Sequence, residues 1–168
     1  MPKPQFSMGQ SKPTSMFPWL HEQVAEAVED VLPSTWFNKA HRDETYNKQY
    51  STNIMGTFQC VNESCSKDRW SSKTVAILIR GYSNNGYNAI VFNQRCKSCN
   101  SLGKLTIDTD SYVERVAYRL KKWAGAAMEV RHHNEKRGPP HERELCEGCK
   151  QGYCQKQFGL VSLRYDRF

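Results

Sequence analysis

The sequence of 168 residues lacks any long apolar run. No stretch approaches the roughly 18 to 20 apolar residues of a membrane-spanning helix, so we expect no membrane span. Residues 1–12 are polar with scattered proline and do not form the apolar centre of a secretory signal. We therefore expect an intracellular protein, cytoplasmic or nuclear, in a reducing environment.

Hydrophobic residues are scarce, at 38% of the sequence, and the mean hydropathy is -0.75. Such a chain has little material for a purely apolar core, although the aromatic residues, at 11%, each bury a large area. The length suits one domain with an appended segment. We expect bound metal ions to compensate for the small core.

Motifs of common enzyme classes are also missing. The sequence has no phosphate-binding P-loop, no glycine-rich dinucleotide fingerprint and no H-E-x-x-H pair. The H-x-E pattern of zinc deaminases fails at His141, because the third position is Arg143. We therefore expect a protein that is not an enzyme.

Cysteine is the residue type that the sequence does supply in a pattern. An odd number of cysteines, without a secretory signal, argues against a disulfide framework. Six of the seven fall into close pairs, which is the spacing of structural zinc ligands. The pairs and the remaining residue are Cys60-x4-Cys65, Cys96-x2-Cys99, Cys146-x2-Cys149 and Cys154.

A structural zinc ion takes four protein ligands, so seven cysteines leave one place open in two sites. His141 lies five residues before Cys146 and directly follows two prolines, which makes it the preferred eighth ligand. His132 or His133 would be the replacement. We predict two Zn²⁺ ions per chain.

Two pairings of the ligands remain open. In the sequential pairing, the first two cysteine pairs bind one ion, and His141 binds the second with the last three cysteines. In the interleaved pairing, Cys146 and Cys149 complete a site with an earlier pair. The sequential pairing is favoured because it closes shorter loops.

The chain pattern predicts four regions: a disordered N-terminus (1–15), a helical segment (16–50), a zinc-binding domain (51–156) and a C-terminal tail (157–168). In the helical segment, a helix opens at Pro18 and stops at Pro33, and a second short helix follows a cap at Ser34 or Thr35.

The predicted domain contains a β-hairpin and a helix. The strand "KTVAILIRGY" turns at "SNNG" (83–86) into a return strand that ends at Cys96, and "KLTID" is a short strand. A helix opens at a capping box of Ser111 and Glu114 and ends at Gly125. We predict an α+β fold: a small, zinc-ribbon-like antiparallel sheet with two structural zinc sites, this helix and the N-terminal helical segment.

Charge is unevenly distributed. The formal net charge is +7, and seven thiolates with two divalent ions would lower it by three, to +4. Residues 1–50 carry 5 basic and 6 acidic side chains, residues 51–110 carry 7 and 4, and residues 111–168 carry 12 and 7. A surface for a polyanion is therefore expected in the C-terminal two thirds.

Two kinds of partner fit these features. RNA or single strands would bind through a basic stripe of Arg115, Arg119 and Lys122, with stacking on aromatic residues near basic ones. The alternative is a protein-interaction adaptor, in which aromatic residues of the N-terminal helical segment anchor a partner. The stacking candidates are Tyr82, Tyr87, Phe92 and Tyr153, and the anchors are Phe17, Trp19, Trp36 and Phe37.

Four segments together resemble the 3CxxC-type zinc finger family, most closely its fungal members. They are "GTFQC" with the following Cys65 and Trp70, "FNQRCKSCN", "SYVERVAYRLKKWAG" and "PPHERELCEGCKQGYC". The family includes receptor-transporting proteins, which assist membrane receptors, and more distantly zygote-arrest proteins, whose finger binds RNA. The resemblance covers about residues 50–156 and implies a zinc-binding, non-enzymatic module. The first pair departs from the family's usual C-x2-C by its longer spacer.

Overall fold

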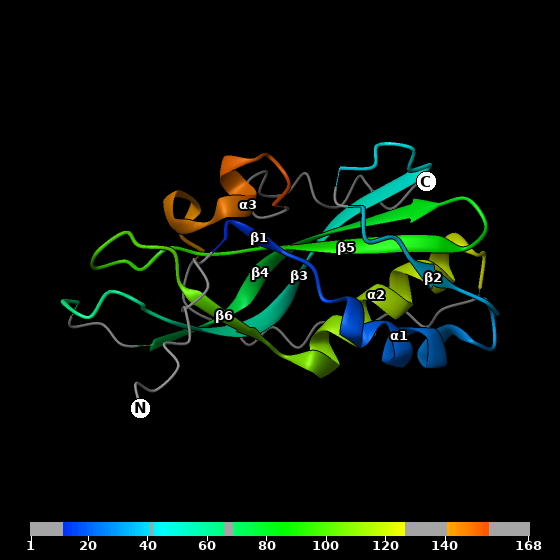
Figure 1. Ribbon diagram of the computed structural model, residues 1–168, viewed down its shortest axis with the longest axis horizontal. Coiled ribbons are helices and arrows are strands. Elements are labelled where there is room, and N and C mark those ends of the chain that lie inside the picture. The colour runs from blue at the N-terminus through cyan, green and yellow to red at the C-terminus, as the bar shows by residue number, and fades with distance from the viewer. Residues whose placement is uncertain (1–11, 41, 66–68, 127–140, 155–168) are drawn as a thin grey trace, which may run out of the picture.

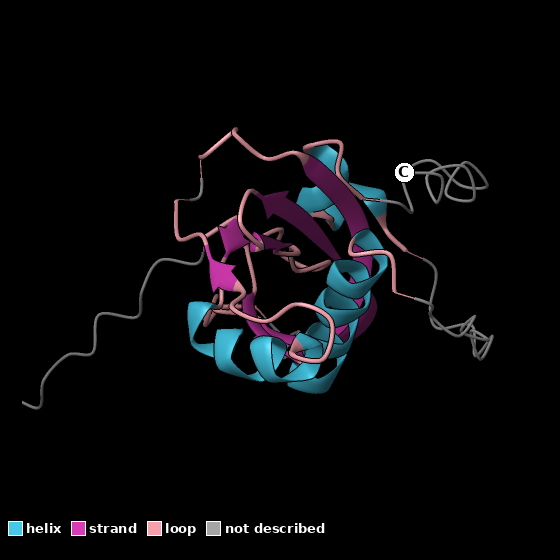
Figure 2. Ribbon diagram, turned by 90° about the vertical axis from the view of Figure 1, so that its right-hand side faces the viewer, coloured by secondary structure: helices cyan, strands magenta, loops and turns pink. Residues whose placement is uncertain are grey.

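The computed structural model describes residues 12–40, 42–65, 69–126 and 141–154. A curled, six-stranded sheet forms its centre (Figures 1 and 2). Helices α1 (His21–Val28) and α2 (Thr109–Trp123) pack on one face of the sheet. The short helix α3 (Glu147–Lys150) lies on the opposite face (Figure 1). The predicted α+β class is confirmed.

The long strands β3 (Lys48–Gln59) and β4 (Arg69–Tyr82) lie in the middle of the sheet. The order is β1-β5-β4-β3-β6, and these neighbours are antiparallel. A sixth strand, β2, pairs with β5 in parallel. The remaining elements are β1 (Thr14–Ser15), β2 (Trp36–Phe37), β5 (Gly86–Phe92), β6 (Lys104–Ile107), and the 3-10 turns η1 (Pro18–Leu20) and η2 (Arg143–Leu145).

The predicted hairpin forms between β4 and β5. From Val75 to Tyr82 every residue of β4 is buried, which explains the continuous β-branched and apolar run. The turn places Asn84 and Asn85 at φ 59° and 62°, so asparagine supplies both left-handed positions. This hairpin gives the sheet its most buried pair of strands.

Two expectations for the N-terminal part were wrong. Thr14 and Ser15, expected to be disordered, pair with the edge of β5, whereas residues 1–11 lie outside the described part. The expected second helix is instead the strand β2. Ser34, at φ 62°, turns the chain after α1, and Asn38 then donates its backbone N–H to Tyr87 O at 2.8 Å.

The strand β2 is held by a close contact at the hairpin end. Trp36 Nε1 donates to Asn84 O at 3.0 Å, and the indole lies directly on Gly86. A Cβ at position 86 would stand 2.4 Å from the Trp36 ring, so only glycine admits it. The local sequence contains no sign of this contact, because its two halves lie fifty residues apart.

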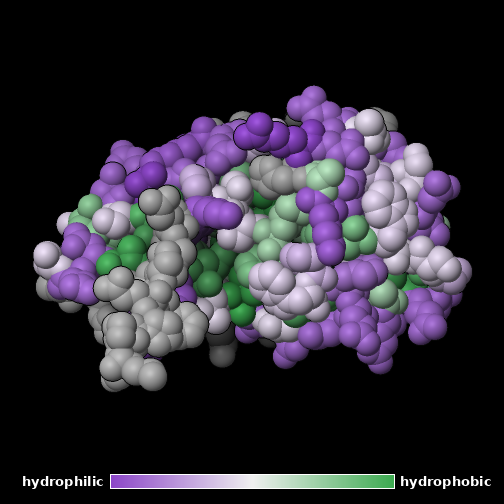
Figure 3. Space-filling view, in the orientation of Figure 1, coloured by the Kyte–Doolittle hydropathy of each residue, from purple (hydrophilic) through white to green (hydrophobic). Residues whose placement is uncertain are grey.

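The core has two parts, one on each face of the sheet. The larger part joins Leu20, Val24 and Val28 of the N-terminal segment to residues of the sheet and of α2. The smaller part joins Leu78 and Phe92 to the cysteines of the C-terminal segment. In the view of Figure 3, hydrophilic residues cover most of the surface, and hydrophobic ones gather near its middle.

Helix α2 has a different cap from the expected one. Asp108 is the N-cap, and its carboxylate accepts the backbone N–H of Ser111 at 2.9 Å. Ser111 instead accepts the backbone N–H of Met55 with its hydroxyl at 3.0 Å and fastens the helix to β3. At the other end Gly125 takes φ 82°, the conformation of a C-terminal glycine.

Within the described ranges, no helix combines the length and the apolar character needed to cross a membrane.

Replacing Leu20 tests whether the N-terminal segment belongs to the core. Leu20→Ala is expected to lower the free energy of unfolding by about 2–5 kcal/mol, because it opens a cavity between α1 and the sheet. Gln23→Ala, an exposed position of the adjoining helix α1, should change it by less than about 0.5 kcal/mol. Chemical denaturation measures both. Equal stability of the two variants would contradict the shared core.

Candidate metal centres

The first cluster, site 1, joins the end of β3 to the loop after β5. It contains Cys60, Cys65, Cys96 and Cys99, whose sulfurs all lie within 4.8 Å of one another. Cys60 Sγ lies 3.5 Å from Cys99 Sγ, and Cys65 Sγ lies 3.7 Å from Cys96 Sγ. The end of β3 lies beside this loop because the loop leads into β6, and Gln59 at the end of β3 pairs with Lys104 at the start of β6.

Backbone and hydroxyl groups shape the second loop of site 1. Cys96 donates its backbone N–H to Ser101 O at 2.8 Å, and Asn100 takes φ 60° to close the turn. Hydrogen bonds from the side chain and backbone of Ser101 lower the pKa of the Cys99 thiol to about 6. Ser101 therefore favours the thiolate, the form that binds a metal ion.

The second cluster, site 2, is made by the C-terminal described segment alone. It contains His141, Cys146, Cys149 and Cys154, again within 4.8 Å of one another. His141 Nε2 lies 3.2 Å from Cys149 Sγ and 3.5 Å from Cys154 Sγ. The three cysteines are buried, so this site is more enclosed than site 1.

The imidazole of His141 is oriented from the sheet. Its Nδ1 lies 2.8 Å from Thr74 Oγ1, which leaves Nε2 pointing at the sulfurs. Such a second partner fixes the ring and the tautomer of a metal-binding histidine. Neither Thr74 nor Ser101 was found from the sequence. Thr74 lies 67 residues before His141 along the chain, whereas the place of Ser101, two residues after Cys99, was a usable signal.

Both clusters fit a tetrahedral zinc ion. Zinc–sulfur bonds of about 2.3 Å place two sulfurs of a tetrahedron about 3.8 Å apart. Two sulfur pairs of site 1, at 3.5 and 3.7 Å, are close to that value. In site 2, burial and the neighbouring Cys154 raise the pKa of the Cys149 thiol to about 11. A divalent cation would offset the crowding of thiolates there.

The grouping follows the sequential pairing, and the interleaved one does not form. His141 is in place as the eighth candidate, and its alternatives His132 and His133 lie outside the described residues. Each cluster has four protein donors, which is the composition of a closed, structural site.

The two sites are joined by a short piece of antiparallel pairing. Gln94 and Cys146 form a β-bridge, and Arg95 donates its backbone N–H to Leu145 O at 2.8 Å. Arg95 Nε also forms an ion pair with Glu147 Oε1 at 2.7 Å. Glu147 is buried, so it needs this partner. The loop of site 1 and the helix of site 2 therefore begin side by side.

Helix α3 presses site 2 against the sheet through a glycine. A Cβ added to Gly148 would stand 2.5 Å from the Cβ of Ala76 in β4. Neither group can move aside without shifting a backbone element. Gly148 thus sets how closely Cys146 and Cys149 approach the strand.

The residues expected to bind nucleic acid are not all available. Arg119 is only 3% exposed, and its guanidinium lies 3.3 Å from the centre of the Tyr50 ring. The prediction that Arg115, Arg119 and Lys122 form an exposed basic stripe is therefore wrong, because Arg119 is buried. The stacking candidates Tyr82, Tyr87 and Phe92 are buried core residues, and Tyr153 stacks on Phe92 with ring centres 5.8 Å apart.

Comparison with known proteins agrees with this geometry. Residues 53–152 match the family model of the 3CxxC zinc ribbon, which is described as a zinc-binding domain. The chain belongs to this family. No curated protein and no solved structure matches the chain significantly. The matched range holds seven of the eight candidate ligands of the zinc ribbon, and Cys154 lies two residues beyond it.

A change at Gly148 tests the packing of site 2. Gly148→Ala is expected to weaken zinc retention, because the added methyl pushes α3 away from Ala76. The double variant Gly148→Ala/Ala76→Gly removes the opposing methyl and should regain most of the retention. Release of zinc to a chromogenic chelator measures it. Ala76→Gly alone, costing about 1 kcal/mol in a strand, is the control. Equal release from the single and double Gly148 variants would contradict this packing.

Proposed function

We propose that the protein is a non-enzymatic module that holds two structural zinc ions and binds nucleic acid, either RNA or single strands. The zinc part is supported by two clusters of four donors at zinc-like separations in a family of zinc-binding domains. Closed sites of this composition leave no coordination position for a substrate or a reactive water. The ions add to the stability of a chain whose apolar content is low.

The observation that carries the nucleic-acid part is the separation of charge along the fold. Exposed carboxylates gather on and after α1, at Glu22, Glu26, Glu29 and Asp30. Exposed cations lie on the strands beside site 1, at Arg69, Lys73 and Lys104. A polyanion would be drawn toward the strands and away from α1.

A protein-adaptor role is the second candidate, supported by one observation. Trp19 is 70% exposed, which is unusual for so large an apolar side chain. The other three expected anchors are partly used within the molecule: Phe17 packs on Tyr112, Phe37 on Tyr87, and Trp36 on Gly86. Trp19, with Trp36 at 41% exposure, supports an interface less well than the charge separation supports a polyanion.

Metal analysis tests the two-zinc part. Purified protein is expected to contain two zinc ions per chain, and His141→Ala should lower the content toward one. Thr74→Val should keep two ions but weaken retention of one about 10–100-fold, because the imidazole loses its orienting partner. Thr106→Val, an exposed threonine on β6, is the matched control. Unchanged zinc content in His141→Ala would mean that another group closes site 2.

Salt-dependent binding tests the nucleic-acid part. A labelled, unstructured single-stranded RNA should bind at low salt, and its affinity should fall steeply as salt rises, because bound phosphates release counterions. Fluorescence anisotropy at several salt concentrations measures this. Absence of binding at low salt, or an affinity that does not change with salt, would refute the proposal and leave the adaptor role as the better candidate.

A further inference from the structure

One part of the sheet presents two complete cross-strand rows of exposed polar side chains. In β3, β4 and β6, Gln59 pairs with Arg69 on one side and with Lys104 on the other. In the next row on the same face of the sheet, Thr57 pairs with Ser71 and with Thr106. Directly paired residues point to the same face of a sheet. We call these six residues, all exposed, the polar face.

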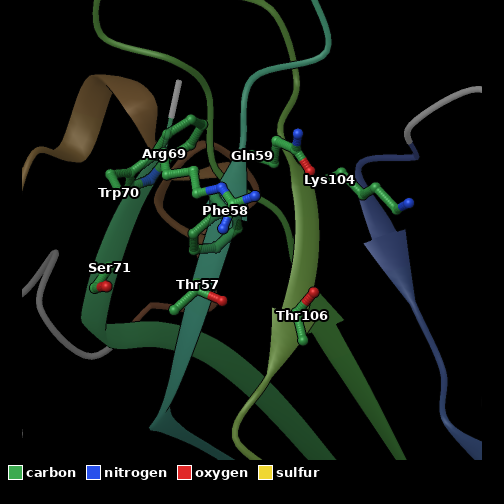
Figure 4. Close-up of a pocket in the computed structure, with 8 residues that line it drawn as sticks. All are labelled: Thr57, Phe58, Gln59, Arg69, Trp70, Ser71, Lys104 and Thr106. Atoms are coloured by element: carbon green, nitrogen blue, oxygen red, sulfur yellow. The ribbon is translucent and has the colours of Figure 1, made fainter. Parts of the chain in front are cut away.

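The polar face borders a hollow of about 600 Å³, which Phe58 and Trp70 also line (Figure 4). The close-up shows Thr57, Ser71 and Thr106 on three neighbouring strands, with Arg69 and Lys104 on the outer two. Zinc site 1 lies next to it, because Cys60 directly follows Gln59. The strands of the face are therefore held in place by the zinc-binding loops at their ends.

The charge of the polar face is positive and uncompensated. It has two cations and four neutral polar side chains, and no carboxylate belongs to either row. Among the described residues, neither Arg69 nor Lys104 takes part in any of the ion pairs present. By contrast, Lys97 and Lys150 elsewhere on the molecule have carboxylate partners. The two cations are thus available to an anionic ligand.

The spacing favours a ligand with several negative groups. Arg69 and Lys104 stand on strands two spacings apart, with a separation of about 10 Å between their backbones. Gln59 lies between the two cations, and Thr57, Ser71 and Thr106 form the neighbouring row. These four side chains can donate hydrogen bonds to phosphate oxygens and sugar hydroxyls. No aromatic side chain belongs to the two rows. Phe58 and Trp70 lie in the row between them and stack on each other with ring centres 5.1 Å apart, so the face does not offer a free platform for stacked bases. A broad, three-stranded face also does not enter a duplex groove as a helix or two-stranded ribbon does.

We propose that the polar face binds the sugar–phosphate backbone of a single-stranded nucleic acid, with little preference for base sequence. This inference rests on the proposed function and adds to it the binding site and the mode of binding. Arg69 and Lys104 contact separate phosphates, and the row of Thr57, Ser71 and Thr106 contacts the backbone between them. The hydroxyl and amide groups position the strand, while the cations supply the salt-dependent part of the affinity.

The test compares two double variants that lose the same charge. Arg69→Gln/Lys104→Gln removes both cations of the polar face. Lys39→Gln/Arg42→Gln removes two exposed cations near the opposite end of the sheet, in the segment after β2, and is the matched control. The salt dependence of binding to an unstructured single-stranded RNA is measured for each. With a contribution of about 0.7 per phosphate contact, the polar-face variant should lose about 1.4 from the slope of log affinity against log salt.

The outcomes separate the inference from the function on which it rests. The inference is supported if only the polar-face variant loses slope and its zinc content stays at the wild-type value. It is overturned, with nucleic-acid binding intact, if both variants lose slope equally or if only the control does. Loss of zinc from the polar-face variant also overturns it, since the cations would then serve the thiolates of site 1. A wild-type protein that binds no RNA overturns the proposed function itself.

Discussion

The structure depends on the joint between the segment around Arg95 and the segment around Glu147. The two segments are some fifty residues apart, yet they share backbone hydrogen bonds, a β-bridge and a buried ion pair. Arg95 directly precedes the loop of site 1, and Glu147 begins helix α3 of site 2. The joint fixes the distance between the two clusters and attaches site 2 to the hairpin. A local segment that could bind one ion by itself thereby becomes part of the same folded unit as the sheet.

Much of the site could be predicted from the sequence, because metal ligation depends on residue type and spacing. Cysteine pairs separated by two or four intervening residues specify loops, and counting to eight ligands identified His141 as the remaining candidate. The hairpin could be predicted equally well, because an apolar run, two asparagines and a return strand are signals that lie close together in the sequence. Loop length was sufficient to choose the sequential pairing, which the clusters follow.

The remainder depends on contacts between distant segments, which no local pattern records. Trp36 and Phe37 form a strand because the edge of β5 offers hydrogen bonds, whereas the candidate caps Ser34 and Thr35 before them suggested a helix. Arg119 looked like a surface residue because helical periodicity separates an apolar face from a polar one, but Tyr50 of β3 covers its guanidinium. Asp108 rather than Ser111 caps α2, because Ser111 has a partner in β3.

The short N-terminal strands have a consequence for how separate copies of the protein behave. An exposed strand edge can pair with another chain and start aggregation. Strand β5 is apolar and would present such an edge, but β1 covers its end at Val91 and Phe92, and β2 covers its start at Gly86 and Tyr87. At the other margin, β6 is only four residues long and carries Lys104. Strands β1 and β2 thus cover the edge of β5 and keep the sheet from pairing with a neighbouring molecule there.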